Sequence, residues 1–112
     1  MSQLRIYQDA IRLVVLCRPL WEQLAARGQP EASKQLRRCS TSVPLNIAEG
    51  TGRYDGNGRQ RFGTARGEAN ETKSVLDLSV ALECLTKSEV ADAWDCADKV
   101  AATMWNLTRR RG

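Results

Sequence analysis

The sequence predicts an all-α protein, an antiparallel up-down four-helix bundle, on three observations. Apolar residues recur at helical spacings of three and four positions in four separate stretches of the chain. The connections between these stretches are short or rich in glycine and proline, and short connections make successive helices antiparallel neighbours. The chain has 112 residues, enough for one domain with a single core, so we expect residues 1–112 to form one bundle.

The first predicted helix, from Leu4 to about Ala26, has two adjacent apolar stripes. The first stripe contains Ile6, Ala10, Leu13, Cys17, Leu20 and Leu24, and the second contains Leu4, Tyr7, Ile11, Val14 and Trp21. A helix that buries one side needs an apolar arc of only about 100°. This helix therefore either lies centrally in the bundle or contacts another subunit with its second stripe. Pro19 should bend it.

The second predicted helix, from about Pro30 to Gly50, contains a proline, an amide and a carboxylate within an apolar pattern. Leu36, Cys39, Val43 and Ile47 form its apolar stripe. Pro44 predicts either a kink or a break near Thr41, because proline removes a backbone hydrogen bond. Asn46 and Glu49 lie on one face of the helix. We expect these two residues and Pro44 to be structural and to hold the helix against its neighbours; the alternative is that both polar side chains face water.

The third predicted helix runs from about Gly58 to Leu85, after a loop of glycines and other turn-forming residues that is suited to binding. Its apolar positions are Phe62, Ala65, Ala69, Thr72 and Leu76, and in its later half Val75, Leu78, Leu82 and Leu85. Gly67 predicts a close crossing with a neighbouring helix, because glycine inside a helix otherwise costs about 1 kcal/mol. We expect Glu71 to pair with Arg37 or Arg38 of the second helix; a solvent-exposed Glu71 is the alternative.

The fourth predicted helix begins in the segment Thr86–Glu89, where two N-terminal caps are available. Ser88 is one candidate, and the other is a capping box between Thr86 and Glu89. Val90, Trp94, Ala97, Ala101 and Met104 form the apolar stripe that follows. Arg109–Arg111 either close the helix, where cations suit the helix dipole, or form a phosphate-binding tail.

The composition argues against several classes of function. The chain has no histidine, the commonest general base and metal ligand, so we expect no enzyme activity, no metal site and no cofactor. Its cysteines, Cys17, Cys39, Cys84 and Cys96, show no C-x-x-C pattern and fall in apolar helical patterns, so we expect reduced core residues. There is neither a membrane-spanning apolar run nor a secretory signal, so we expect a cytoplasmic protein without a membrane partner.

Charge is unevenly distributed along the chain. Residues 31–66 contain seven basic and three acidic residues, whereas residues 67–108 contain three basic and eight acidic residues. A basic face suits phosphate-rich or acidic partners, although solvated helix faces give the same pattern. We expect the residues that bind RNA or DNA among the arginines of the basic segment and of the C-terminal run: Arg37, Arg38, Arg53, Arg59, Arg61, Arg66, Arg109, Arg110 and Arg111.

Two blocks of the sequence resemble a known family. The first is Gln35-Leu36-Arg37-Arg38-Cys39 with Ser42-Val43-Pro44-Leu45-Asn46-Ile47-Ala48-Glu49-Gly50-Thr51-Gly52-Arg53, and the second is Phe62-Gly63-Thr64-Ala65-Arg66-Gly67-Glu68-Ala69-Asn70-Glu71. They are similar to the small bacterial four-helix bundle family encoded in intervening sequences of large-subunit ribosomal RNA genes. That family includes the accessory variability determinant of diversity-generating retroelements. Glu68 departs from the family pattern, which usually reads Gly-Ser at this point.

The resemblance implies a homopentamer with a basic surface that binds nucleic acid or a reverse transcriptase, and it implies no catalytic activity. Together with the residues, it favours a non-enzymatic adaptor built as a homo-oligomeric bundle. One alternative is a structural protein–protein interaction module without nucleic-acid contact. Another is an enzyme that uses Asn46, Glu49 and Glu71 as a buried acid–base cluster, since two carboxylates can do such work when their pKa values differ.

Overall fold

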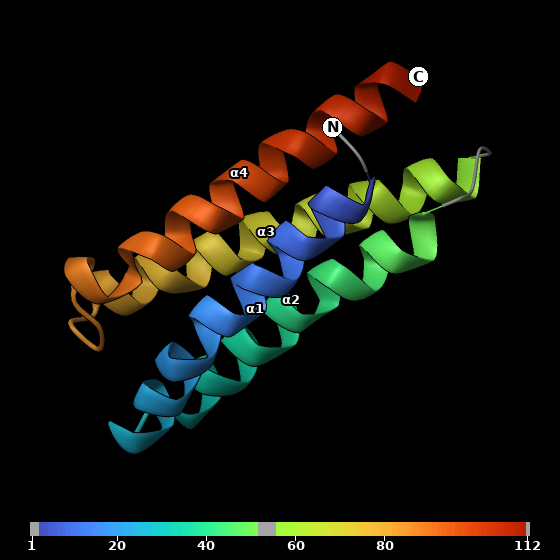
Figure 1. Ribbon diagram of the computed structural model, residues 1–112. Coiled ribbons are helices and arrows are strands. Elements are labelled where there is room, and N and C mark those ends of the chain that lie inside the picture. The colour runs from blue at the N-terminus through green and yellow to red at the C-terminus, as the bar shows by residue number, and fades with distance from the viewer. Residues whose placement is uncertain (1–2, 52–55, 112) are drawn as a thin grey trace.

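The structure is a computed structural model that describes residues 3–51 and 56–111, although the side chains of residues 110 and 111 lie outside the description. It contains four helices: α1 (Gln3–Ala26), α2 (Pro30–Gly50), α3 (Gly56–Ala81) and α4 (Lys87–Arg111). Figure 1 shows them side by side, each running opposite to the one before it. The described residues contain no strand, so the predicted all-α, up-down bundle is confirmed.

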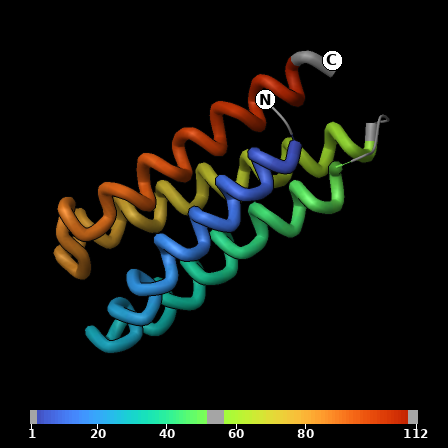
Figure 2. Tube along the Cα trace, in the orientation of Figure 1, coloured from blue at the N-terminus to red at the C-terminus, as the bar shows by residue number. Residues whose placement is uncertain are grey.

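The helices form a closed ring of four around one core. α1 packs against α2 and α4, and α3 packs against the same two helices. The bundle is a rod of 44 × 20 × 20 Å. In Figure 2, the α1–α2 and α3–α4 turns lie at one end of the rod, whereas α3 begins and α4 ends at the other. The beginning of α3 and the end of α4 are therefore neighbours, although they lie far apart in the sequence.

The two stripes of α1 have different environments. All six residues of the first stripe are buried in the core, as predicted: Ile6, Ala10, Leu13, Cys17, Leu20 and Leu24. In the second stripe, Leu4 is 66% exposed and Ile11 is 41% exposed, and Val15 beside them is 64% exposed. The interpretation that α1 lies centrally is therefore wrong, because this helix has an uncovered apolar face in the single chain.

α2 continues without interruption from Pro30 through Pro44 to Gly50, so the predicted break near Thr41 does not occur. Pro44 itself is buried. In the turn before it, the hydroxyl of Ser40 donates to the Leu36 carbonyl at 2.7 Å, and the hydroxyl of Thr41 donates to the carbonyl of Arg37 at 2.7 Å. Back-bonding of this kind satisfies the side-chain polar groups inside a helix. Burial of the apolar stripe then outweighs the hydrogen bond that proline removes.

The close helix approach predicted at Gly67 occurs instead at Gly50. A Cβ atom added to Gly67 would meet no atom within 4 Å, and the residue is exposed, so that prediction is wrong. A Cβ atom on Gly50 would lie 2.8 Å from Cε1 of Phe62 and 3.2 Å from Cβ of Arg61. Phe62 is only 1% exposed. The last residue of α2 therefore has to be glycine for the Phe62 ring to fill the end of the core.

α3 ends at Ala81, four positions before the predicted end at Leu85. The chain then turns sharply, with Glu83 at a positive φ of 61° and the Cys84 amide donating to the Ser79 carbonyl at 2.8 Å. Leu85 is buried by this turn, but Leu78 and Leu82 are 60% and 71% exposed, contrary to the predicted core positions. Leu82 follows the end of the helix, whereas Leu78 lies within it but on a face turned away from the core that Val75, Leu76 and Ser79 join.

The α4 N-terminus has the predicted capping box, and Ser88 does not cap it. The Thr86 amide donates to Oε1 of Glu89 at 2.8 Å, and the Glu89 amide donates to the Thr86 hydroxyl at 3.1 Å. Arg27, at the end of α1, donates to both Glu89 carboxylate oxygens at 3.1 and 3.0 Å and to the Cys84 carbonyl at 2.8 Å. These charge-assisted contacts, with the capping amide, lower the pKa of Glu89 to about 2.

Candidate nucleic-acid interface

The charged residues of α3 lie on two different sides of the helix. Residues seven positions apart share a side, because seven residues make nearly two full turns. Arg59, Arg66 and Lys73 lie on the side that faces α4, where Lys73 forms an ion pair with Asp98 at 2.9 Å. Residues two positions further along, such as Glu68, lie on the side that faces α2. The arginines of the basic segment therefore separate into groups with different neighbours.

A groove between α3 and α4 brings three of the predicted arginines together. Its lining residues are Arg59, Gln60, Gly63 and Arg66 from α3 and Trp105, Thr108 and Arg109 from α4. It has a volume of about 440 Å³. Its lining residues belong to the beginning of α3 and the end of α4, and Figure 1 shows these two segments at one end of the rod. Since α3 begins here, the positive end of its dipole adds to the field of the arginines.

Arg66 and Trp105 form the centre of this groove. The guanidinium carbon of Arg66 lies 4.7 Å from the centre of the Trp105 ring, which is cation–π geometry. Arg66 is half-buried, and its Nε atom is buried with no hydrogen-bond partner among the described residues. Trp105 is nevertheless 47% exposed. An arginine held on an indole ring provides a positive charge that can attract a phosphate, and the ring provides an aromatic surface on which a base can stack.

On the α2 side of α3, glutamates of α3 engage an arginine of α2 within the bundle. Arg38 forms ion pairs with Glu71 and, at 3.5 Å, with Glu68, and Gln35 also donates to Glu71. The predicted pairing of Glu71 with an arginine of α2 is confirmed, and Arg38 rather than Arg37 is the partner. Its guanidinium is therefore neutralised by two carboxylates and is a poor candidate for phosphate binding.

The remaining predicted arginines lie outside the groove or outside the described part of the chain. Arg37 is exposed on α2, and Arg61 donates to Oδ1 of Asn46 on α2 at 3.4 Å. Arg53 falls on the undescribed residues, as do the side chains of Arg110 and Arg111. Of the nine arginines among which the nucleic-acid contacts were predicted, the groove brings together Arg59, Arg66 and Arg109 among the described side chains.

The chain matches the sequence model of the 23S rRNA-intervening sequence protein family over residues 2–106. It belongs to this family. The fold is also similar to a solved structure from Bacteroides thetaiotaomicron VPI-5482, a protein with unknown function from the S23 ribosomal protein family. The TM-score is 0.84 at 21% identity, over 92% of this chain and 97% of that one. The comparison with curated proteins found no match.

The two sequence blocks that resemble the 23S rRNA-intervening sequence family meet along the contact between α2 and α3. Gly50 of the first block receives the ring of Phe62 from the second. Glu68, the departure from the family pattern, is half-buried and accepts a hydrogen bond from the Ser42 hydroxyl at 3.1 Å in addition to its contact with Arg38. These motif residues therefore stabilise the helix pair, and the groove of Arg59, Arg66 and Arg109 lies on the other side of α3, towards α4.

Asn46 and Glu49 do not form an acid–base cluster with Glu71. Asn46 is half-buried and donates from Nδ2 to the Ser42 carbonyl at 3.0 Å, while Glu49 is exposed. Glu71 contacts α2 at Gln35 and Arg38, which at 1.5 Å per residue is about 12 Å or more along the helix from Asn46. The three groups are too far apart to act on one substrate atom.

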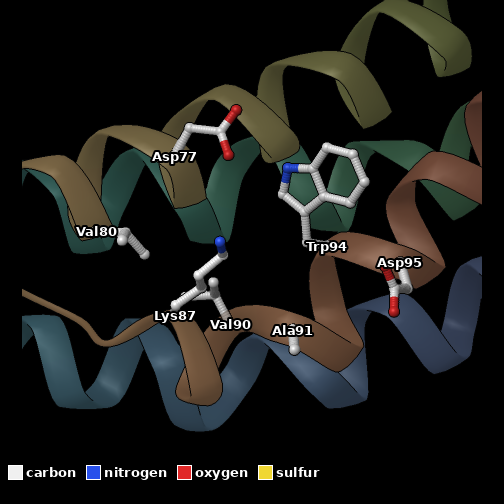
Figure 3. A pocket seen from close by; sticks show the side chains of 7 residues that line it. All are labelled: Asp77, Val80, Lys87, Val90, Ala91, Trp94 and Asp95. Atoms are coloured by element: carbon white, nitrogen blue, oxygen red, sulfur yellow. The ribbon is translucent and has the colours of Figure 1, made fainter.

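A second hollow lies further along the same two helices and differs in charge. It has a volume of about 480 Å³ and is lined by Asp77, Val80, Lys87, Val90, Ala91, Trp94 and Asp95, as Figure 3 shows. Lys73 lies over the Trp94 ring, with its Nζ atom 5.2 Å from the ring centre. α3 and α4 thus repeat one arrangement, a cation of α3 on a tryptophan of α4. Arginines line the groove at the first tryptophan, and two carboxylates line the hollow at the second.

The described residues show neither a metal-binding cluster nor a membrane-spanning helix. No group of three or more histidine, cysteine or acidic side chains has a metal-binding arrangement there. Within the same ranges, no helix is long and apolar enough to cross a membrane. The thiols of Cys17 and Cys39 are buried, and burial raises the pKa of Cys17 to about 12, so that thiol stays protonated and unreactive.

Proposed function

We propose that this member of the 23S rRNA-intervening sequence family is a non-enzymatic adaptor that binds RNA or DNA through the groove between α3 and α4. The observation that supports this most strongly is the convergence of Arg59, Arg66 and Arg109 around an exposed Trp105. Arginines of this kind bind the phosphate backbone without reading base sequence. The family description, which concerns sequences within ribosomal RNA genes, is consistent with a nucleic-acid partner.

The proposal includes assembly into a homo-oligomer, which we take to be a homopentamer. Leu4, Ile11 and Val15 on α1 and Leu45 on α2 are 66%, 41%, 64% and 67% exposed in the single chain. Exposed apolar residues that line up along one helix face are typical of subunit contacts. A symmetric ring repeats the basic groove on every subunit, and several weak contacts on one strand then give a strong overall affinity.

The absence of catalytic activity is part of the same proposal. The chain has no histidine, and the two carboxylates of the candidate acid–base cluster have different surroundings. Glu71 accepts a hydrogen bond from Arg38, whereas Glu49 is exposed. Glu71 is engaged by Arg38, which holds it as a charged structural partner. In this proposal the protein acts by bringing partners together, with a reverse transcriptase as a protein partner beside the nucleic acid.

The test measures nucleic-acid affinity at several salt concentrations for the double variant Arg59→Gln/Arg109→Gln. Each lost phosphate contact should reduce the slope of log K against log salt by about 0.7–0.9. Arg18→Gln/Lys34→Gln is the matched control, because it removes the same charge from exposed positions on α1 and α2. Light scattering follows the oligomeric state of every variant. Equal slopes in both double variants with an intact oligomer would exclude the groove.

The second candidate function is a structural protein–protein module without nucleic-acid binding. The exposed apolar face of α1 and α2 favours it, since that face alone is sufficient reason for a subunit or partner contact. The two candidates differ at low salt, where phosphate contacts are strongest. An intact oligomer that binds neither RNA nor DNA at low salt supports the second candidate.

A further inference from the structure

We propose that the groove binds unpaired nucleotides, with one base stacked on the ring of Trp105 and the flanking phosphates on Arg59 and Arg109. This inference rests on the proposed function and specifies its ligand: single-stranded nucleic acid, or the single-stranded part of a structured one. Trp105 supplies the aromatic surface of this groove, which a count of arginines in the sequence does not reveal.

Trp105 has the exposure and the support that a stacking platform needs. The residue is 47% exposed, although tryptophan is among the residue types with the largest apolar surface. Arg66 lies over the ring at 4.7 Å from its centre, and 47% of the residue is still exposed, so part of the indole is accessible to a ligand. A flat aromatic surface that remains accessible suits a base of any sequence.

The charges around Trp105 match a nucleotide in kind and position. Arg59 lines the groove from α3 and Arg109 lines it from α4, and Thr108 adds a half-buried hydroxyl. The volume of about 440 Å³ falls within the range of about 300–1,000 Å³ typical of small-molecule sites, so it suits a short piece of strand rather than a whole duplex.

Duplex nucleic acid cannot use this arrangement fully. In a double helix each base is stacked between its neighbours, so its faces are hidden and only phosphates, sugars and groove edges are accessible. An exposed tryptophan in a basic groove therefore adds affinity for unpaired bases, while the arginines attract both forms.

The second tryptophan of α4 provides a comparison within the same chain. Trp94 also has an α3 cation over its ring, Lys73, but it is half-buried and shares its hollow with two carboxylates, Asp77 and Asp95, and one lysine, Lys87. Those carboxylates repel phosphates. The same pair of helices thus has one tryptophan suited to a nucleotide and one that is not.

The experiment compares a mixed-sequence single-stranded RNA, the same strand as DNA, and the corresponding duplexes, with Trp105→Leu and Trp105→Phe variants. The wild type should bind single strands more tightly than duplexes of equal length at matched salt. Trp105→Leu should weaken single-strand binding about 5- to 100-fold and change duplex binding little, because it removes stacking but no charge. Trp105→Phe should retain most of the affinity. The slope of log K against log salt should be the same in all three proteins.

Fluorescence gives a second readout that does not depend on the leucine variant folding. Stacking of a base should quench the wild-type tryptophan emission, and Trp105→Phe should lose that quenching while Trp21 and Trp94 still emit. If single strands and duplexes bind equally, and neither Trp105 variant changes affinity or quenching, the inference is wrong. The proposed function then still stands, provided that Arg59→Gln/Arg109→Gln weakens binding. If no nucleic acid binds at low salt, both fall.

Discussion

Gly50 offers a sharp test of how α2 and α3 fit together. It is the last residue of α2 and is buried, and the ring of the core residue Phe62 lies directly against its backbone. Replacing Gly50 by alanine places a methyl group 2.8 Å from Cε1 and 3.0 Å from Cδ1 of that ring. Contacts this short cannot persist, so Phe62 must move away or the two helices must separate.

The expected cost follows from two opposing effects. Overpacking a well-filled core by one methyl group costs about 1–3 kcal/mol. Alanine improves helix propensity by up to about 1 kcal/mol, but the gain is smaller at the terminal position of a helix. Gly50→Ala should therefore lower the free energy of unfolding by about 1–2 kcal/mol, which for a domain of this size corresponds to a fall in Tm of about 4–8 °C.

Gly67→Ala is the matched control, because Gly67 is an exposed glycine in the middle of α3 with open space around its Cα atom. The same substitution there should raise the free energy of unfolding by up to about 1 kcal/mol. Thermal and urea unfolding at one fixed protein concentration measure both variants, since assembly contributes to the apparent stability. A Gly50→Ala protein that melts at or above the wild-type temperature would refute the packing argument.

Three further outcomes are expected. Ile11→Glu/Val15→Glu should dissociate the oligomer in light scattering while the circular dichroism stays helical, because both side chains are exposed in the single chain. Arg27 holds the pKa of Glu89 at about 2 instead of 4.5, so their contact stabilises the fold fully above pH 4.5, and this stabilisation is lost as the pH falls towards 2. Glu89→Gln should therefore flatten the stability–pH curve between these two values. Arg38→Gln should reduce stability by about 1 kcal/mol or less and leave nucleic-acid affinity unchanged.

The helical periodicity predicted the core well, because burial in a bundle depends on a repeat that is visible in the sequence. Every residue of the first stripe of α1 is buried, and so are Phe62, Ala65, Ala69, Thr72 and Leu76 of α3. The pattern failed near the end of α3. There Leu78 and Leu82 continue the apolar spacing, but Leu78 lies on an exposed face of α3 and Leu82 follows the end of the helix at Ala81. The positive φ of Glu83 belongs to a turn that no glycine or proline in the sequence predicts.

Contacts between helices were harder to predict than the helices. Gly50 and Gly67 both interrupt an apolar pattern, yet only Gly50 faces a bulky side chain, and this depends on how the helices are rotated. Arg37 and Arg38 differ by one position, or about 100° around α2, and that difference decides which of them reaches Glu71. Trp105 could have been noticed as the one tryptophan of α4 that falls outside its apolar stripe.

The division of α3 into two charged sides leads to a quantitative expectation for binding. If all nine arginines of the basic segment and the C-terminal run contacted phosphates, the slope of log K against log salt for a single strand would be about −6, at about 0.7 per contact. Arg38 is neutralised by Glu68 and Glu71, and the groove itself presents Arg59, Arg66 and Arg109. With Arg66 held on the Trp105 ring, the phosphates fall to Arg59 and Arg109, and two contacts give a slope of about −1.4 for an oligonucleotide short enough to occupy one groove. A measured slope near −6 with such an oligonucleotide would mean that the groove is not the limit of the interface, and that arginines on the α2 side of the bundle also bind the strand.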